Sequence, residues 1–163
     1  MQTLNAHLAA SGHALAMKGM SMLRPIVVPA GQVLYRFYDT ARAATPRLGA
    51  DGAWWLEFEH FQTIRHFALR HGYSLSYAAR LFVAVLYEWS EINAVVAART
   101  VVPLSAWKGR GKQMSSTGKD ARDLPTMTPM QSVLEVYQLY LPGMGGHRSL
   151  SPQALEVHWH GIA

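Results

Sequence analysis

The feature that most constrains the fold is a change in hydrophobic period along the chain, from two residues to about 3.6 and back again. Alternating or β-branched segments predict strands, and the two central segments with a helical period predict helices. Strands that lie on both sides of a helical pair predict an α+β domain with a mainly antiparallel sheet, since a parallel sheet would need helices alternating with strands. The predicted strands span 26–39, 53–58, 93–104, 133–141 and 154–159, and the predicted helices span 61–72 and 75–89.

The chain of 163 residues is predicted to form a single domain, 1–163. Half of its residues are hydrophobic and 15% are charged, which is enough apolar material for a core without disulfides. We expect an N-terminal helical segment over 1–24 and a long polar loop over 105–130, where Gly, Lys, Ser, Thr and Pro predominate.

The net charge of +5 favours an anionic partner. The absence of cysteine excludes disulfides, thiolate catalysis and Cys-ligated zinc. No apolar run is long enough to span a membrane, and the segment 1–22 lacks the pattern of a signal peptide. We therefore expect a cytoplasmic protein that binds no membrane. The alternative that it is an effector delivered without a signal peptide stays open.

Arg36 lies within an alternating apolar strand, between Tyr35 and Phe37. A guanidinium in this position either reaches solvent along its apolar stem or lies in a cleft, where its planar fork can hold a phosphate or carboxylate. The two interpretations stay open, and the second predicts an anionic ligand for Arg36.

An ordered set of short motifs resembles the ADP-ribosyltransferase superfamily and its NAD-hydrolysing toxin relatives. The motifs are Pro29-x-Gly31-x-x-Leu34-Tyr35-Arg36, the aromatic strand Trp54-Trp55, a helix, and a late strand with Gln138-Leu-Tyr140 before Pro142-Gly143. The resemblance implies a domain that uses NAD as its substrate, in a bacterial toxin or effector, with a protein target or an inhibitor as its partner.

The resemblance also implies roles for individual residues. Arg36 and Tyr35 would bind NAD, Trp54 and Trp55 would shape the pocket for the nicotinamide ring, and Gln138 or Glu135 would act near the reacting ribose. The strand Trp54-Trp55-Leu56-Glu57 lacks the serines that are common in the family, and Glu135 and Gln138 do not form its usual late pair. NAD hydrolysis, an atypical transferase and a non-catalytic relative therefore all stay open.

Gln138 is expected to face the same cleft as Arg36, with Val136 and Tyr140 on its side of the strand. Glu135 would then lie on the opposite face. A neutral amide can orient a ribose or a water molecule but cannot act as a general base, so slow hydrolysis is expected more than efficient transfer.

The alternative is a basic accessory protein of plasmid or phage type, which binds nucleic acid or inhibits a protein partner without chemistry. Its signal is the segment from Trp107 to Lys112, where Lys108, Arg110 and Lys112 alternate with glycines. No metal is expected, because the eight histidines are dispersed and only His158 and His160 form a close pair.

Overall fold

The computed structural model describes residues 3–83, 90–112, 114–115, 122, 126–127 and 135–163. A seven-stranded sheet organises this part of the chain, in the order β1-β5-β8-β3-β2-β4-β9, and every neighbouring pair is antiparallel. The strands of this sheet are β1 (Met20–Val28), β2 (Val33–Tyr38), β3 (Trp54–Glu57), β4 (Ala94–Thr100), β5 (Leu104–Gly111), β8 (Tyr137–Tyr140) and β9 (Leu155–Ile162), and β6 (Met114–Ser115) pairs separately with β7 (Thr126–Met127).

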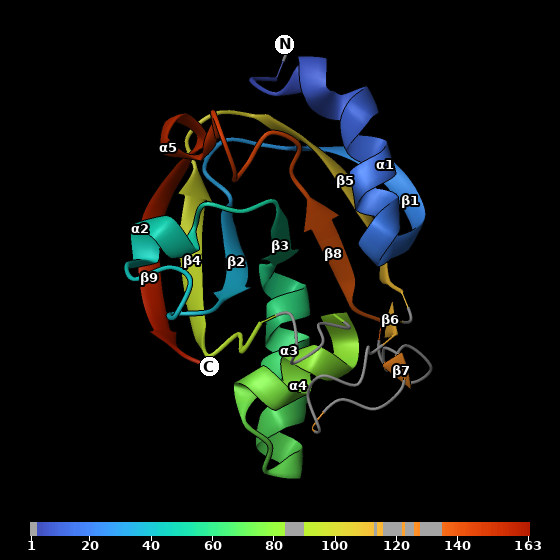
Figure 1. Cartoon of the computed structure of the whole chain (residues 1–163), viewed down its shortest axis with the longest axis vertical. Coiled ribbons are helices and arrows are strands. Elements are labelled where there is room, and N and C mark those ends of the chain that lie inside the picture. The colour runs from blue at the N-terminus through green and yellow to red at the C-terminus, as the bar shows by residue number, and fades with distance from the viewer. Residues whose placement is uncertain (1–2, 84–89, 113, 116–121, 123–125, 128–134) are drawn as a thin grey trace.

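The helices lie around this sheet, with α3 and α4 at its lower end and α1 beside β1 and β5 (Figure 1). Glycine and serine set two of their ends: Gly72 ends α3 in the left-handed conformation, and the Ser74 hydroxyl accepts the Tyr77 amide at 3.1 Å before α4. No helix in the described ranges is long and apolar enough to cross a membrane. The helices are η1 (Ala6–Leu8), α1 (Ala9–Gly19), α2 (Pro46–Gly49), α3 (Phe58–His71), α4 (Leu75–Val83) and α5 (Ser151–Ala154).

The sheet has a weak junction in its middle. Strands β2 and β3 are joined through two residue pairs, Leu34 with Glu57 and Tyr35 with Leu56. In Figure 1 the half formed by β9, β4 and β2 lies on the left, and the half with β8, β5 and β1 lies on the right. A space between the two halves can open beyond Tyr35, because the backbone pairing stops there.

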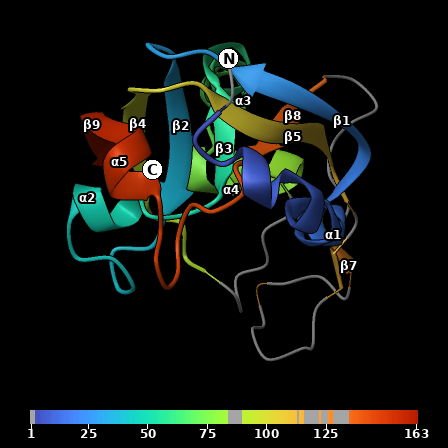
Figure 2. The same ribbon diagram turned by 90° about the horizontal axis from the view of Figure 1, so that it is seen from above.

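The two faces of the sheet bury different clusters, since side chains alternate along each strand. One face carries the main core, with Leu34, Trp55 and Leu139 among its buried members. The other face is covered by α3 and α4, which bury Leu56 and Val136. Further along this second face, α1 packs over Tyr140 and Trp54. Figure 2 shows the sheet from above, with α1 below β5.

The predicted fold class is confirmed: the chain is an α+β domain with an antiparallel sheet and a central pair of helices, α3 and α4. The segment 26–39, predicted as one or two strands, holds the end of β1 and the whole of β2; the predicted strands at 53–58 and 154–159 also exist, and β9 is an edge strand as expected. The part of the second predicted helix that falls on 84–89 lies outside the described residues.

The predicted N-terminal helical segment over 1–24 is wrong at its end, because α1 stops at Gly19 and β1 begins at Met20. Pairing with β5 at Met20, at Ser21 and again from Arg24 onward holds these residues in a strand, with an irregularity between Ser21 and Arg24. Within α1, Gly12 is needed for close packing, since a Cβ there would lie 2.7 Å from the Cγ of Pro142.

The predicted polar loop over 105–130 is wrong for its first part, which forms β5 between β1 and β8. The glycines that suggested a loop have a packing role instead. A Cβ on Gly109 would lie 2.6 Å from the carbonyl oxygen of Ser21, in the irregular part of β1. Of the remaining loop residues, 113, 116–121, 123–125 and 128–130 lie outside the described part of the chain.

Candidate functional site

A cavity of about 560 Å³ opens at the junction of the two half-sheets, between the ends of α1 and α4. Its volume falls within the range of roughly 300 to 1,000 Å³ that is typical of small-molecule sites. Its described lining combines aromatic, aliphatic and basic side chains and contains no carboxylate. The lining residues are Lys18, Gly19, Tyr35, Arg36, Phe37, Arg42, Trp54, Trp55, Leu56, Val83, Ser90, Ile92 and Gln138.

Gln138 brings the most unusual polar group to this cavity. Its side chain is 7% exposed, and within the described residues its amide has no hydrogen-bond partner. Since this amide is not among the fully buried unsatisfied atoms of the described residues, it reaches the cavity, where water or a ligand can supply its hydrogen bonds. Gln138 lines the cavity and Glu135 is not part of its described lining, and a role for Gln138 near a reacting ribose stays a prediction.

Aromatic side chains form the walls. Tyr35 stacks on Phe61 with ring centres 4.2 Å apart, which fixes its ring against α3. Trp54 packs edge-on against Tyr140 at 5.0 Å and lies so close to Gly19 that a Cβ there would be 2.8 Å from the indole ring. Flat, fixed rings of this kind suit a planar heteroaromatic ligand.

Trp55 has a different role from the one that the family resemblance implies. Its side chain is buried in the main core, and its indole N–H donates to the carbonyl oxygen of Gly52 at 2.7 Å. The indole therefore packs within the protein and has no free donor for a ligand.

Arg36 is also held by the protein. Its Nε donates to the carbonyl oxygen of Gly49 at 3.0 Å, and one terminal nitrogen donates to that of Trp54 at 3.1 Å. Burial lowers the pKa of Arg36 to about 10, against the opposing influence of Asp51, so the guanidinium stays charged at neutral pH. A role of Arg36 in phosphate binding stays a prediction, but two of its donors are already in use.

Strand register separates Arg36 from Gln138. Tyr35 lies opposite Leu56, and the pairing of Trp55 with Leu139 places Leu56 beside Gln138 on one face. Because successive side chains point to opposite faces of a strand, the Arg36 side chain points to the other face of the sheet. Both residues line the same cavity, as expected, but the expectation that they share one face of the sheet is wrong, because it depended on a cross-strand register that spans three strands.

Glu135 lies outside the cavity. Its side chain is 66% exposed, and Oε1 is 2.6 Å from a terminal nitrogen of Arg110. It therefore has an ion-pairing role on the surface, away from the buried amide of Gln138.

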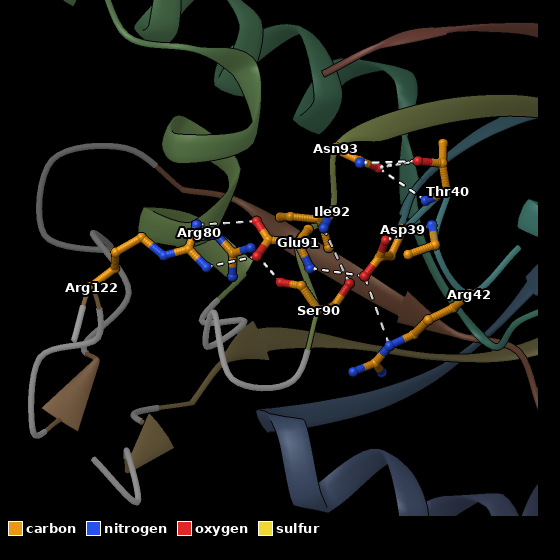
Figure 3. A network of polar contacts seen from close by, with 10 residues as sticks. Asp39, Thr40, Arg42, Arg80, Ser90, Glu91, Ile92, Asn93 and Arg122 are labelled. Atoms are coloured by element: carbon orange, nitrogen blue, oxygen red, sulfur yellow. Dashed lines mark hydrogen bonds and ion pairs between the residues drawn. The ribbon is translucent and has the colours of Figure 1, made fainter. Parts of the chain in front are cut away.

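A polar network, drawn in Figure 3, includes the cavity-lining residues Arg42, Ser90 and Ile92. The buried carboxylate of Asp39 accepts the backbone amides of Ala41 at 2.9 Å and Glu91 at 3.2 Å, and it lies 3.8 Å from Nε of Arg42. Asp39 thereby ties the turn after β2 to the segment that carries Ser90. Sequence reasoning missed this arrangement, whose only local signal is the three-residue spacing between Asp39 and Arg42.

The three cations of the nucleic-acid alternative all have partners. Lys108 is buried and lies 2.6 Å from Oε1 of Glu57, and Arg110 binds Glu135 and the hydroxyl of Tyr137. Lys112 donates to the carbonyl oxygen of Met17. The hypothesis that these residues form an open basic loop is wrong, because Lys108 and Arg110 belong to β5, between β1 and β8, and Lys112 follows its last residue.

Glu57, Glu59 and His60 form a second polar cluster, with one ligand atom from each within 4.8 Å of the others. Glu57 and Glu59 do not lie on one face of a strand, because β3 ends at Glu57 and Glu59 belongs to α3. Nδ1 of His60 accepts the amide of Tyr137 at 3.3 Å, which leaves the imidazole proton on Nε2, toward Glu59. Lys108 already supplies positive charge here, so the donor set does not suit a metal ion.

Acidification is expected to weaken the fold through His60. Burial, together with the charge of Lys108, lowers the pKa of His60 below its ordinary 6.5, against the influence of Glu59 and Glu57. Below pH 6.5 the unfolded chain then binds more protons than the folded protein, so the free energy of unfolding falls until the pH reaches the folded pKa. Urea unfolding from pH 7.5 to 5 measures this fall. His60→Gln should reduce it, whereas His66→Gln on the exposed side of α3 should retain it; an unchanged slope in His60→Gln would contradict the assignment.

These features define an α+β domain with a basic, aromatic cavity at a split in its sheet. No protein-family model matches the chain, and no curated protein sequence matches it. A chain in the structure of Tne2 in complex with Tni2 is 15% identical, with a TM-score of 0.50, and the match covers 86% of this chain and 92% of that one. A chain in the structure of Rhs1-CT in complex with its cognate immunity protein RhsI1 is 14% identical, with a TM-score of 0.55 and 95% of both chains covered. At these identities the likeness shows a shared fold.

Proposed function

We propose that this chain is an effector-type domain of the ADP-ribosyltransferase superfamily that binds NAD in the cavity and slowly hydrolyses it. The observation that carries the proposal is the Gln138 amide, which has no hydrogen bond to the described residues and lines a cavity with aromatic walls and basic residues. The aromatic rings suit the flat nicotinamide and adenine rings, and the positive charge suits the diphosphate.

Gln138 has the chemistry to orient the reacting groups. Hydrolysis breaks the bond between nicotinamide and C1′ of the ribose, the bonding electrons leave with nicotinamide, and water adds to C1′ with release of a proton to solvent. The Gln138 amide can donate to a ribose oxygen and accept from the attacking water. Because the described lining offers no carboxylate as general base, hydrolysis should be slow and transfer to a second substrate inefficient.

A protein partner belongs to the same proposal. A chain in the complex of Rhs1-CT with its cognate immunity protein RhsI1 shares this fold, which supports a protein partner for this chain as well. A partner that covers the cavity mouth, near Arg42 and Ser90, would exclude NAD and leave the domain inactive.

Ligand-observed NMR with NAD tests the proposed function directly. The purified domain should broaden the NAD signals within minutes and release free nicotinamide over hours, while NAD alone stays intact. Binding without nicotinamide would show a non-catalytic relative. Neither binding nor release would contradict the proposal.

A further inference from the structure

The cavity carries positive charge that the Gln138 assignment does not use. Its described lining includes three cations, Lys18, Arg36 and Arg42, and no acidic side chain. Charge of one sign along an apolar cavity attracts an anionic ligand, because the surrounding walls screen it less than bulk water does.

Arg36 is the least available of the three. Two of its donors bind the carbonyl oxygens of Gly49 and Trp54, and a Cβ on Gly52 would lie 2.1 Å from its guanidinium carbon. Its side chain also leaves the sheet on the face opposite Gln138, as the register shows. A ligand that contacts Gln138 would therefore meet the other two cations.

Lys18 and Arg42 keep their donors available. Lys18 lies in the last turn of α1 beside Gly19, against which Trp54 packs, and in the described part of the chain its ammonium has no ion pair. The Arg42 side chain is 65% exposed, and its 3.8 Å separation from Asp39 exceeds the roughly 2.7 to 2.9 Å of a charge-assisted hydrogen bond. Figure 3 shows Arg42 directed toward Asp39 through one edge of its guanidinium.

We infer that Lys18 and Arg42 form a two-cation clamp for the diphosphate of a dinucleotide, with Trp54 as the adjoining aromatic wall and Gln138 at the ribose. The clamp rests on the proposed function, and it replaces Arg36 as the phosphate ligand. The guanidinium of Arg42 holds a phosphate through two parallel bonds, and the ammonium of Lys18 acts as a compact charge.

Isothermal titration calorimetry at low salt tests the clamp with two probes, NAD and inorganic pyrophosphate. The double variant Lys18→Gln, Arg42→Gln removes both cations. The matched control is Arg65→Gln, Arg70→Gln, which removes two exposed cations from α3. We expect the clamp variant to bind both probes on the order of a hundredfold more weakly, about tenfold for each charged contact, while the control binds as the wild type does.

The two probes separate the clamp from the proposed function. If the wild type and the clamp variant bind NAD with the same affinity, the clamp is overturned and the proposed NAD hydrolysis is not. The wild type could bind pyrophosphate, lose this binding in the clamp variant, and release no nicotinamide from NAD. That result would support the clamp and overturn the proposed hydrolysis. If the wild-type protein binds neither probe, both are overturned.

Discussion

Replacing Gln138 with methionine should lower nicotinamide release from NAD at least about a hundredfold, the usual effect of removing one hydrogen-bond donor from a reacting centre. Methionine nearly preserves the side-chain volume but has no amide. Because the described residues give this amide no hydrogen bond to lose, the melting temperature should stay the same or rise. Initial rates by NMR and a thermal melt of the same preparation measure both quantities.

Glu135→Gln is the matched control for this experiment. Glu135 lies in the same region of the chain but pairs on the surface with Arg110, so its loss should change the rate less than about threefold. Equal rates in the wild type and Gln138→Met would remove Gln138 from the reaction. A large loss of stability in Gln138→Met would assign the amide to packing.

Arg36→Lys should destabilise the fold more than it changes ligand binding. Lysine keeps the charge but cannot reach the carbonyl oxygens of Gly49 and Trp54 together as the guanidinium does. Loss of one such charged hydrogen bond lowers the free energy of unfolding by about 1.5 to 3 kcal/mol. The melting temperature should then fall by roughly 3 to 12 °C. Denaturant unfolding measures the first value directly.

The exposed Arg65 provides the control, since Arg65→Lys should leave the free energy of unfolding unchanged within about 0.5 kcal/mol. A variant Arg36→Lys with full stability but weakened NAD affinity would contradict the structural role. It would restore the original prediction that Arg36 holds the phosphates.

The sequence alone predicted some local features correctly. Alternation over 33–38 and the helical stripe that ends at Gly72 were sufficient for β2 and α3, because the period of burial is a property of consecutive residues. The same rule predicted that Gln138 and Glu135 lie on different sides, since they are three positions apart, but β8 begins only at Tyr137 and does not include Glu135.

The tertiary structure decided what those side chains meet. Whether Arg36 and Gln138 share a face depends on the register across β2, β3 and β8, which local periodicity does not contain. The glycines near Lys108 suggested a loop. In the structure, Gly109 lies so close to β1 that a larger residue would collide with the carbonyl oxygen of Ser21. Lys18 and Arg42 carry no motif, and they border one cavity because the two half-sheets separate beyond Tyr35. The pairing of strands that are far apart in the sequence therefore determines which residues form the site.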